Sequence, residues 1–245
     1  MLNHYVLPPV SSSPSEPLYG AQTQKAVENF PVSGLRLPHT FLRALGLIKQ
    51  AAAEVNVELG LLPTDIGAAI ISAAAAVAAG QYDAHFPIDV FQTGSATSTN
   101  MNANEVIARL ATQNLGLAVH PNDHVNLGQS SNDVIPTAIH VSATLLLRES
   151  LVPALRYLAR TLDELAAHYR GAVKTGRTHL MDAVPITLGQ EFSAWATQIH
   201  LGLQRMDCVQ ARISKLAIGG TAVGTGLNAH PELGERVCLH LSHYT

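Results

Sequence analysis

The sequence predicts an all-α protein in which a small N-terminal helical domain is followed by the start of a long-helix bundle. Two observations support this fold class: apolar residues recur at intervals of three and four along most of the chain, and strand-like alternation is nearly absent. The length of 245 residues suits one large domain or two modest ones. We place a boundary near Leu127, which gives an N-terminal domain at 1–127 and the first part of a central bundle at 128–245.

The N-terminal domain is predicted to contain at least two helices. A proline- and serine-rich stretch, read as loop, extends to about residue 37. Thr40 is placed to cap a first helix that runs toward Gly60. Pro63-Thr64-Asp65 opens an alanine-rich second helix, and Gly80 closes it. The apolar face of the first helix contains Leu42, Leu45, Ile48, Ala52 and Val55.

Two longer helices with bundle-like spacing are predicted after Pro136. Each apolar run covers about 30 residues and corresponds to a helix roughly 45 Å long. The loop between them contains Gly171, Gly176 and Pro185, so the helices are expected to run antiparallel, with a kink at Pro153 in the first. The runs consist of Leu147, Leu151, Leu155, Leu158, Leu162 and Leu165, then Leu188, Phe192, Trp195, Ile199, Met206, Val209, Ile213 and Leu216.

A last helix begins at Pro231-Glu232 and repeats the bundle spacing. The chain reaches Thr245 without the Gly, Asn or Pro that commonly ends a helix. Two and a half long helices leave apolar faces uncovered. The pattern therefore predicts the N-terminal portion of a longer protein, with a truncated bundle. The spaced residues of this helix are Leu233, Val237, Leu241 and Tyr244.

Composition argues against several classes of function. The formal net charge is −3 and 13% of residues are charged, without a basic stripe for nucleic acid. The apolar stretches are interrupted by polar residues, so none is predicted to form a membrane span of about 20 residues. Met1–Pro17 lacks the features of a secretory signal, which favours a cytoplasmic protein. Cys208 and Cys238 are expected to be small buried apolar side chains.

Four polar islands interrupt the helical pattern, and each is rich in groups that bind anions. In residues 94–100, hydroxyl and backbone N–H groups lie just ahead of a predicted helix, where the helix dipole favours a carboxylate. Taken alone, this island is equally consistent with an ordinary N-cap. The second island, residues 120–133, places Ser130, Ser131 and Asn132 at the start of another helix.

The second island does not predict a metal site. His120, Asp123 and His124 are potential ligands, but Pro121 breaks the helical face that a histidine pair at i and i+4 needs. We therefore expect no metal.

The third and fourth islands differ in the chemistry they allow. Residues 176–182 hold His179 in a loop next to glycine, where an imidazole serves as a general acid or base near neutral pH. A surface histidine is the alternative, and it fits most of the 12 histidines. Residues 219–228 have the composition of a phosphate loop but lack its Gly-Lys-Ser/Thr ending and a preceding strand, so that function is excluded.

In their order and spacing, these islands resemble the fumarase/aspartase superfamily. The resemblance covers most of the chain, from Gly20-Ala21-Gln22-Thr23-Gln24 onward, and several of its motifs are long and specific. The motifs are GSATSTNMNANEV, HPNDHVN, GQSSNDVIPTA, GRTHLMDAVPITLGQE and GGTAVGTGLN. Three positions resemble class II fumarate hydratases. Thr178-His179-Leu180 stands where aspartases have a central Gln, Ser130-Ser131-Asn132 where they have Ser-Thr-Asn, and Gly219-Gly220-Thr221 where they have Gly-Ala-Thr.

The resemblance implies a fold, an activity and a set of site residues. It implies a homotetramer of helical bundles whose active sites draw on several chains, and reversible hydration of fumarate to L-malate in the tricarboxylic acid cycle, without a cofactor. His179 would be the proton donor and acceptor. The dicarboxylate would be held by Ser95, Ala96, Thr97, Ser130, Ser131, Asn132 and Thr178, and a second dicarboxylate site would comprise His120, Pro121, Asn122 and Asp123.

The sequence also departs from the family pattern. The family's flexible Gly-Ser-Ser-rich loop, which ends in Pro-Gly-Lys-x-Asn-Pro and carries a serine base, does not occur in these residues, so the chain is expected to be inactive as written. Ala96 stands where the family has a glycine, and Leu127-Gly128 replaces a more polar pair. Leu117 and Ala118 give the second dicarboxylate site no basic partner.

Two alternatives to a fumarase remain open from the sequence. One is another lyase of the superfamily, with aspartate ammonia-lyase first. The other is a non-catalytic helical oligomerisation fragment, which the uncovered bundle faces favour.

Overall fold

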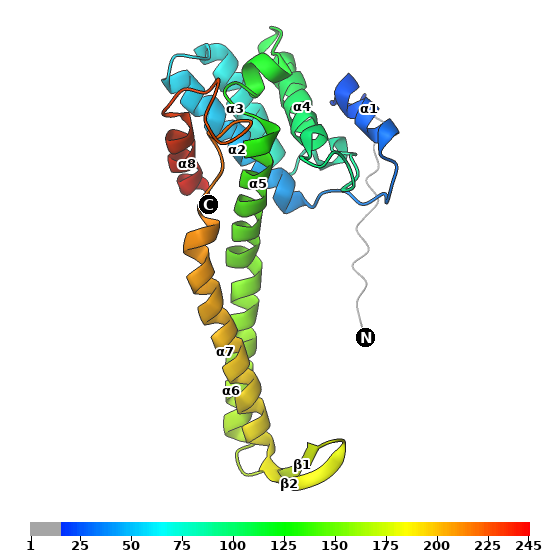
Figure 1. The fold of residues 1–245 in the computed structure, drawn as a ribbon, viewed down its shortest axis with the longest axis vertical. Helices are drawn as coiled ribbons and strands as arrows, with labels where there is room; N and C mark the ends of the chain where they lie inside the picture. Colours follow the sequence, from blue (N-terminus) through cyan, green and yellow to red (C-terminus); the bar gives the residue numbers. More distant parts are fainter. Residues whose placement is uncertain (1–15) are drawn as a thin grey trace.

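A computed structural model describes residues 16–245. A compact group of helices at one end is joined to a long helical hairpin that ends in a small β-hairpin (Figure 1). The predicted all-α class is confirmed, with one local exception in this β-hairpin. The helices are α1 (Ala21–Asn29), α2 (His39–Glu58), α3 (Thr64–Ala78), α4 (Thr97–Leu115), α5 (Ser131–Leu146), α6 (Val152–His168), α7 (Leu188–Ile213) and α8 (Leu233–Tyr244).

Helix α2 lies at the centre of the compact part. It packs against α3, α5 and α8. Leu45, Ile48 and Val55 on the predicted apolar face of α2 are fully buried. The predicted cap at Thr40 is wrong: α2 begins at His39, and Pro38 precedes it in an extended conformation without a side-chain cap. The second helix begins at Thr64 and ends just before Gly80, as predicted.

Helix α1 lies within the stretch that the sequence analysis read as loop. Its N-terminus is held by a distant residue, Glu105 of α4. The carboxylate accepts hydrogen bonds from the backbone N–H groups of Gly20 and Thr23 at 2.9 and 3.1 Å, and from Thr23 Oγ1 at 2.6 Å. Such a cap supplies partners for the free N–H groups of a short helix, and local sequence gives no sign of it.

Helices α5 and α6 form one continuous helical stretch, Ser131–His168, of 38 residues. At 1.5 Å per residue it is roughly 57 Å long. A π-helical turn, Leu147–Leu151, joins the two helices directly before Pro153. A proline in a helix removes one hydrogen bond and crowds the carbonyl four residues earlier, and a wider turn relieves that crowding.

The long stretch is also apolar enough, by length and mean hydropathy of 1.2, to cross a membrane. Its first half packs into the compact core through Val134, Ala138 and Leu145. Its second half carries four charged residues, which are costly within a bilayer. This weakly apolar helix therefore does not indicate a membrane protein. The charged residues are Arg156, Arg160, Asp163 and Glu164.

Helix α7 packs along α6 as the antiparallel partner that the sequence predicted. Only Ala159 of α6, and Gly189 and Ala196 of α7, are buried, so most of the spaced apolar side chains remain exposed. Cys208 is exposed on α7, and the expectation that it is buried is wrong. The large exposed apolar side chains of this hairpin include Leu151, Tyr157, Leu158, Trp195, Leu201 and Val209.

The loop predicted between the long helices is a β-hairpin. Strands β1 (Val173–Thr178) and β2 (Met181–Thr187) pair antiparallel, with an irregularity between Thr175 and Arg177. These strands were not predicted because Gly176 and Pro185 lie inside them, and both residues are typical of turns. The β-hairpin extends outward from the end of the two long helices, so its turn lies away from them (Figure 1).

Helix α8 begins where Pro231-Glu232 predicted, but it packs on α2. Leu233, Val237 and Leu241 join the compact core. Its last turns are held by Glu54 of α2, which lies 2.8 Å from His240 Nδ1 and accepts hydrogen bonds from Tyr244 Oη at 2.7 Å. The periodic residues of α8 were identified correctly, whereas the surface that they cover was not. The division near residue 127 stays a prediction.

The close approach of α2 and α3 at Gly46 gives a test of the core. A Cβ at this position would lie 2.6 Å from the backbone nitrogen of Ala78 and 2.8 Å from the carbonyl oxygen of Ala74. Gly46→Ala should therefore lower the free energy of unfolding by about 1–3 kcal/mol, although alanine favours a helix. Urea unfolding followed by circular dichroism measures the change.

Gly171→Ala is the matched control, because a Cβ there would meet no heavy atom within 4 Å. Its stability should stay within about 0.5 kcal/mol of the parent chain. Equal stability of the Gly46 variant and the parent would contradict the tight helix contact.

Candidate functional site

The N-termini of α4 and α5 meet, and their hydroxyl groups form a connected row. Ser95 Oγ lies 2.7 Å from Thr97 Oγ1, and Thr97 Oγ1 lies 3.0 Å from Ser131 Oγ. The first and second polar islands are therefore brought together, although 34 residues separate Thr97 from Ser131. We refer to Ser95, Thr97 and Ser131 as the hydroxyl cluster.

The start of α5 is fixed by a capping box. Ser130 Oγ accepts a hydrogen bond from the backbone N–H of Asn132 at 3.2 Å, and Asp133 Oδ1 accepts one from the N–H of Ser130 at 2.9 Å. The side-chain amide of Asn132 also donates to Ser130 Oγ at 3.2 Å. This arrangement leaves the Ser131 side chain to contact α4.

Two helix N-termini with exposed hydroxyl groups suit a bound anion. Backbone N–H groups without intrahelical partners and the positive ends of both helix dipoles attract negative charge. Hydroxyl groups add donors whose hydrogens rotate to follow the ligand. A carboxylate is the simplest anion that matches this cluster.

The fourth island packs beneath α5 through a buried carboxylate. Asp133, which is 1% exposed, accepts hydrogen bonds at Oδ2 from the backbone N–H groups of Gly219 and Thr221, at 3.1 and 2.9 Å. The glycine-rich segment 219–228 therefore packs against the start of α5, near the hydroxyl cluster. The Asp133 side chain both completes the capping box and binds the backbone of this segment.

Lys49 of α2 is a buried residue of this region that sequence reasoning missed. Its side chain is fully buried, and Nζ donates to Asn126 Oδ1 and Gln129 Oε1, both at 2.9 Å. Burial lowers the pKa of Lys49 to about 7, against the attraction of the nearby Asp133 carboxylate. The signal in the sequence was its place next to Ile48, on the apolar face of a predicted core helix.

The residues of the implied second dicarboxylate site lie on the surface at a π-helical turn, Pro121–Val125. His120 Nδ1 lies 3.1 Å from both the backbone nitrogen and Oδ2 of Asp123, and the His120 N–H donates to His124 Nδ1 at 3.0 Å. These side chains therefore contact one another. Within residues 16–245, no group of three potential metal ligands is placed to hold an ion.

Thr178 and His179 lie at the tip of the β-hairpin, far from the hydroxyl cluster (Figure 1). His179 and Leu180 form the turn, with φ of 51° and 61°. The helical stretch that separates Ser131 from the hairpin is roughly 57 Å long. The chain by itself therefore brings together Ser95, Thr97 and Ser131, and keeps His179 apart from them.

Left-handed backbone conformations gather at the polar islands. Among residues 16–245, every non-glycine residue with positive φ lies in one of the islands. Such conformations cost energy for residues with a Cβ and tend to persist at functional sites. Ala96, with φ of 49°, is the position where the family has a glycine, which adopts this conformation freely. The residues are Ala96, His179, Leu180, Thr221 and Asn228.

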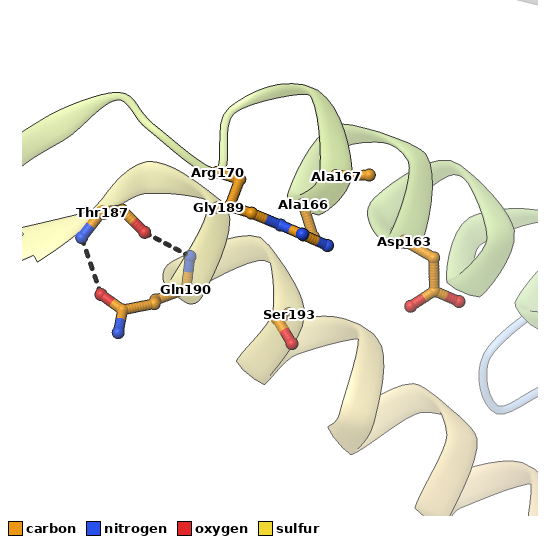
Figure 2. Close-up of a pocket in the computed structure, with 8 residues that line it drawn as sticks. All are labelled: Asp163, Ala166, Ala167, Arg170, Thr187, Gly189, Gln190 and Ser193. Carbon is orange, nitrogen blue, oxygen red and sulfur yellow. Dashed lines mark hydrogen bonds between the residues drawn. The ribbon is translucent and has the colours of Figure 1, made fainter.

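A hollow at the base of the hairpin contains none of the predicted site residues (Figure 2). It lies between the end of α6 and the start of α7, where Thr187 and Gln190 form a capping box. A Cβ on Gly189 would lie 2.6 Å from the carbonyl oxygen of Ala166, so glycine permits the two helices to meet here. This hollow therefore lies where the two helices of the hairpin meet, apart from the hydroxyl cluster.

A family described as Lyase matches residues 11–245, and the chain belongs to this family. Among its relatives are two proteins named fumarate hydratase class II. That of Xylella fastidiosa (strain Temecula1) is 55% identical over 95% of this chain and 49% of its own length, and that of Halobacterium salinarum is 54% identical over 95% of this chain and 50% of its own.

A solved structure of class II fumarase from Schistosoma mansoni has the same fold. Its TM-score is 0.90 at 40% sequence identity, and the match covers 95% of this chain and 50% of that chain. The resemblance to class II fumarate hydratases is thereby confirmed. The chain spans about half the length of the curated relatives that it matches.

The pKa of Lys49 predicts how stability depends on pH. The pKa is about 7 in the folded chain and 10.5 as the reference for the unfolded chain, so the unfolded chain binds more protons between these values. The free energy of unfolding should therefore rise with pH in this window, by up to about 1.4 kcal/mol per pH unit. Below the pKa of the folded chain, Lys49 is charged in both states, and burial of the charge then lowers the free energy of unfolding by its full amount.

Lys49→Met removes the titrating group while retaining a long side chain. Urea unfolding of both proteins between about pH 6 and pH 9 isolates the contribution of Lys49, because all other groups are shared. As pH rises, the free energy of unfolding of the parent should increase relative to that of Lys49→Met. Parallel curves would mean that Lys49 keeps its ordinary pKa in the folded chain.

Proposed function

We propose that this chain is part of a class II fumarate hydratase, which interconverts fumarate and L-malate. The observation that carries this proposal is the hydroxyl cluster at two converging helix N-termini, in a chain that is 53–57% identical to proteins of that name. The cluster suits one carboxylate of a small dicarboxylate, and the family relation supplies the reaction.

The chemistry of the reaction fits the residues of this site. Removal of the C3 proton of malate places two negative charges on the neighbouring carboxylate, so the site needs many hydrogen-bond donors that are already in place. Departure of hydroxide needs a proton, which an imidazole supplies. The dehydration removes the C3 proton and breaks the C2–O bond, and the leaving hydroxide gains a proton and departs as water. No electron is transferred to an acceptor, and we propose that no cofactor takes part. The donors would come from Ser95, Ala96, Thr97, Ser130, Ser131, Asn132 and Thr178.

We propose that each active site combines residues of several copies of the chain in a homotetramer. His179 and Thr178 lie at the hairpin tip, roughly 57 Å of helix away from Ser131, so they cannot reach the hydroxyl cluster of their own chain. The hairpin offers a large apolar surface, with Leu180 100% exposed and Val184 74% exposed. A second copy that supplies the cluster would also cover part of this surface.

The remaining features of the proposal rest on the family relation. The surface turn at His120, Pro121, Asn122 and Asp123 is proposed as a second dicarboxylate site. The protein is proposed to be cytoplasmic and to act in the tricarboxylic acid cycle. Its division into residues 1–127 and 128–245 is likewise a proposal.

An assay that compares two reactions tests the proposed activity. The chain is co-expressed with the portion of the Xylella fastidiosa relative that it does not match, so that a complete lyase can assemble; we call this the completed assembly. Hydration of fumarate without deamination of aspartate supports the proposal. Aspartate deamination would favour an ammonia-lyase, and neither reaction would favour a non-catalytic fragment.

His179→Asn tests the role of the hairpin histidine. In the completed assembly, this variant should lower kcat for malate dehydration by about 100-fold or more, because it loses a general acid. The fold should be unaffected, since the side chain lies at an exposed turn and asparagine tolerates positive φ. Absorbance of fumarate measures the rate. Near-normal dehydration would remove His179 from the mechanism.

Thr178→Val tests the neighbouring hydroxyl, which forms hydrogen bonds but does not titrate near neutral pH. Loss of this donor should lower kcat of the completed assembly by roughly 10-fold while the pH optimum stays in place. Initial rates measured across a pH series give both quantities. A shifted optimum with unchanged kcat would contradict the assignment.

The exposed apolar faces predict that the 245-residue chain does not stay monomeric. Each exposed leucine forgoes roughly 1.5–3 kcal/mol of burial, and several of them together rival the stability of a domain. The chain alone should self-associate or aggregate, and it should lack fumarase activity because the Gly-Ser-Ser-rich loop that carries the family's serine base does not occur in these residues. Sedimentation velocity and a hydration assay provide the test. A monomeric chain that unfolds cooperatively would contradict this account.

A further inference from the structure

Lys49 is expected to lower the stability of the fold at its buried position on α2. It is the largest fully buried side chain in residues 16–245, and it lies at 0% exposure on the central helix α2. Burial of an ammonium group is unfavourable, and a long apolar side chain would fill the same volume without that penalty. Helix α2 presents apolar residues on either side, at Leu45 and Ala52. The core alone therefore does not explain a lysine here.

The partners of Lys49 both belong to the segment that leads into α5. Asn126 and Gln129 each accept one hydrogen bond from Nζ through a side-chain oxygen, at 2.9 Å. The Asn126 amide in turn donates to the backbone carbonyl of Gln129 at 3.2 Å. Gln129 is directly followed by Ser130 and Ser131, so the ammonium group holds the chain immediately before the α5 N-terminus.

The same network reaches the helix that carries the other half of the hydroxyl cluster. Asn100 lies in the first turn of α4, three residues after Thr97, and is 2% exposed. Its Nδ2 donates to Asn126 Oδ1 at 3.2 Å, which is the oxygen that also accepts from Lys49. Asn126 lies in the segment before α5, and its Oδ1 accepts hydrogen bonds from both α2 and α4. This one atom therefore connects the three elements.

We propose that Lys49 is a positioning residue, which acts through Asn126 and Gln129 to set the α4 and α5 N-termini so that Thr97 and Ser131 act as one carboxylate site. Lys49 does not touch the substrate in this proposal. The effect on catalysis rests on the proposed fumarate hydratase function, whereas the effect on the two helix N-termini does not.

A buried amino group suits this task because its hydrogen bonds fix the positions of their acceptors more firmly than an apolar contact would. Loss of this donor would leave the buried amide oxygens of Asn126 and Gln129 without it. Errors of about 1 Å in the position of substrate-binding groups can reduce rates about 100-fold. A small displacement of Asn126 or Gln129 would therefore also displace Thr97 and Ser131 of the hydroxyl cluster.

The test compares three variants in the completed assembly. Lys49→Met keeps the length of the side chain and loses the hydrogen-bond donor, and Lys49→Arg keeps a donor at the end of a long side chain. Val55→Ala, at a fully buried position on the same helix, is the control for loss of stability alone. The measurements are kcat and KM for fumarate hydration, the midpoint of urea unfolding, and hydrogen exchange of the backbone segments 95–100 and 126–133 by mass spectrometry.

We expect Lys49→Met to lower kcat by about 10- to 100-fold, and Lys49→Arg to restore part of it. Exchange should become faster at segments 95–100 and 126–133 in Lys49→Met, relative to the rest of the chain. Val55→Ala should lower the unfolding midpoint without a selective change in these segments or in kcat. In a Gln129→Leu background, Lys49→Met should have a smaller effect, because both changes act on one network.

The outcomes separate the two proposals. An active assembly in which Lys49→Met keeps its kcat and its exchange pattern overturns the role of Lys49 and leaves the proposed function intact. An assembly that hydrates no fumarate before any substitution overturns the proposed function. The exchange measurements then decide the role of Lys49: selective loss of protection in the two segments supports it, and uniform or no loss overturns it.

Discussion

The start of α5 depends on a buried carboxylate, and much of the surrounding structure depends on that helix start. Asp133 closes the capping box with Ser130 and holds the backbone of Gly219 and Thr221. A charge that is 1% exposed needs several donors or a nearby opposite charge to offset its desolvation. Three backbone N–H groups supply such donors, and Lys49 is near enough for its charged form to be attracted by this carboxylate. The start of α5 is therefore held by a polar network inside an alanine-rich core.

The long helix imposes a second constraint, because it separates the hydroxyl cluster from His179 at the hairpin tip. A stretch of 38 helical residues is stiff and extends roughly 57 Å, so the hairpin tip cannot fold back onto the hydroxyl cluster. Hydroxyl donors and the histidine can meet only if different copies contribute them. The exposed apolar residues of α6, α7 and the hairpin are consistent with this arrangement, since packing between copies would cover them. Catalysis and assembly would then share one surface.

The sequence predicted the parts that follow local rules. Spacing by three and four located α2, α6, α7 and α8, Pro63-Thr64-Asp65 and Gly80 marked the ends of α3, and the Ser130 cap marked the start of α5. The sequence did not predict the features that depend on residues far apart in the chain. Glu105 caps α1 from 82 residues beyond Thr23, and α8 packs on α2 although its pattern resembles a bundle helix. The hydroxyl cluster was predicted as two separate anion-binding islands, and only the fold shows that Thr97 and Ser131 are 3.0 Å apart. The motif resemblance predicts which residues form the site, and it does not predict the hydrogen bonds of Lys49.

Exceptions to the local rules coincide with the polar islands. The turn of the β-hairpin is formed by His179 and Leu180, both left-handed, where a hairpin of this kind favours Asn-Gly. Ala96 holds a glycine-like conformation directly before α4, and Lys49 occupies a core position that an apolar side chain would fill at lower cost. A sequence selected for stability alone would replace each of these residues. His179, Leu180 and Ala96 lie in the polar islands, and Lys49 donates to Asn126 and Gln129 of the second island. The geometry of the islands, rather than the stability of the helices, therefore accounts for these positions.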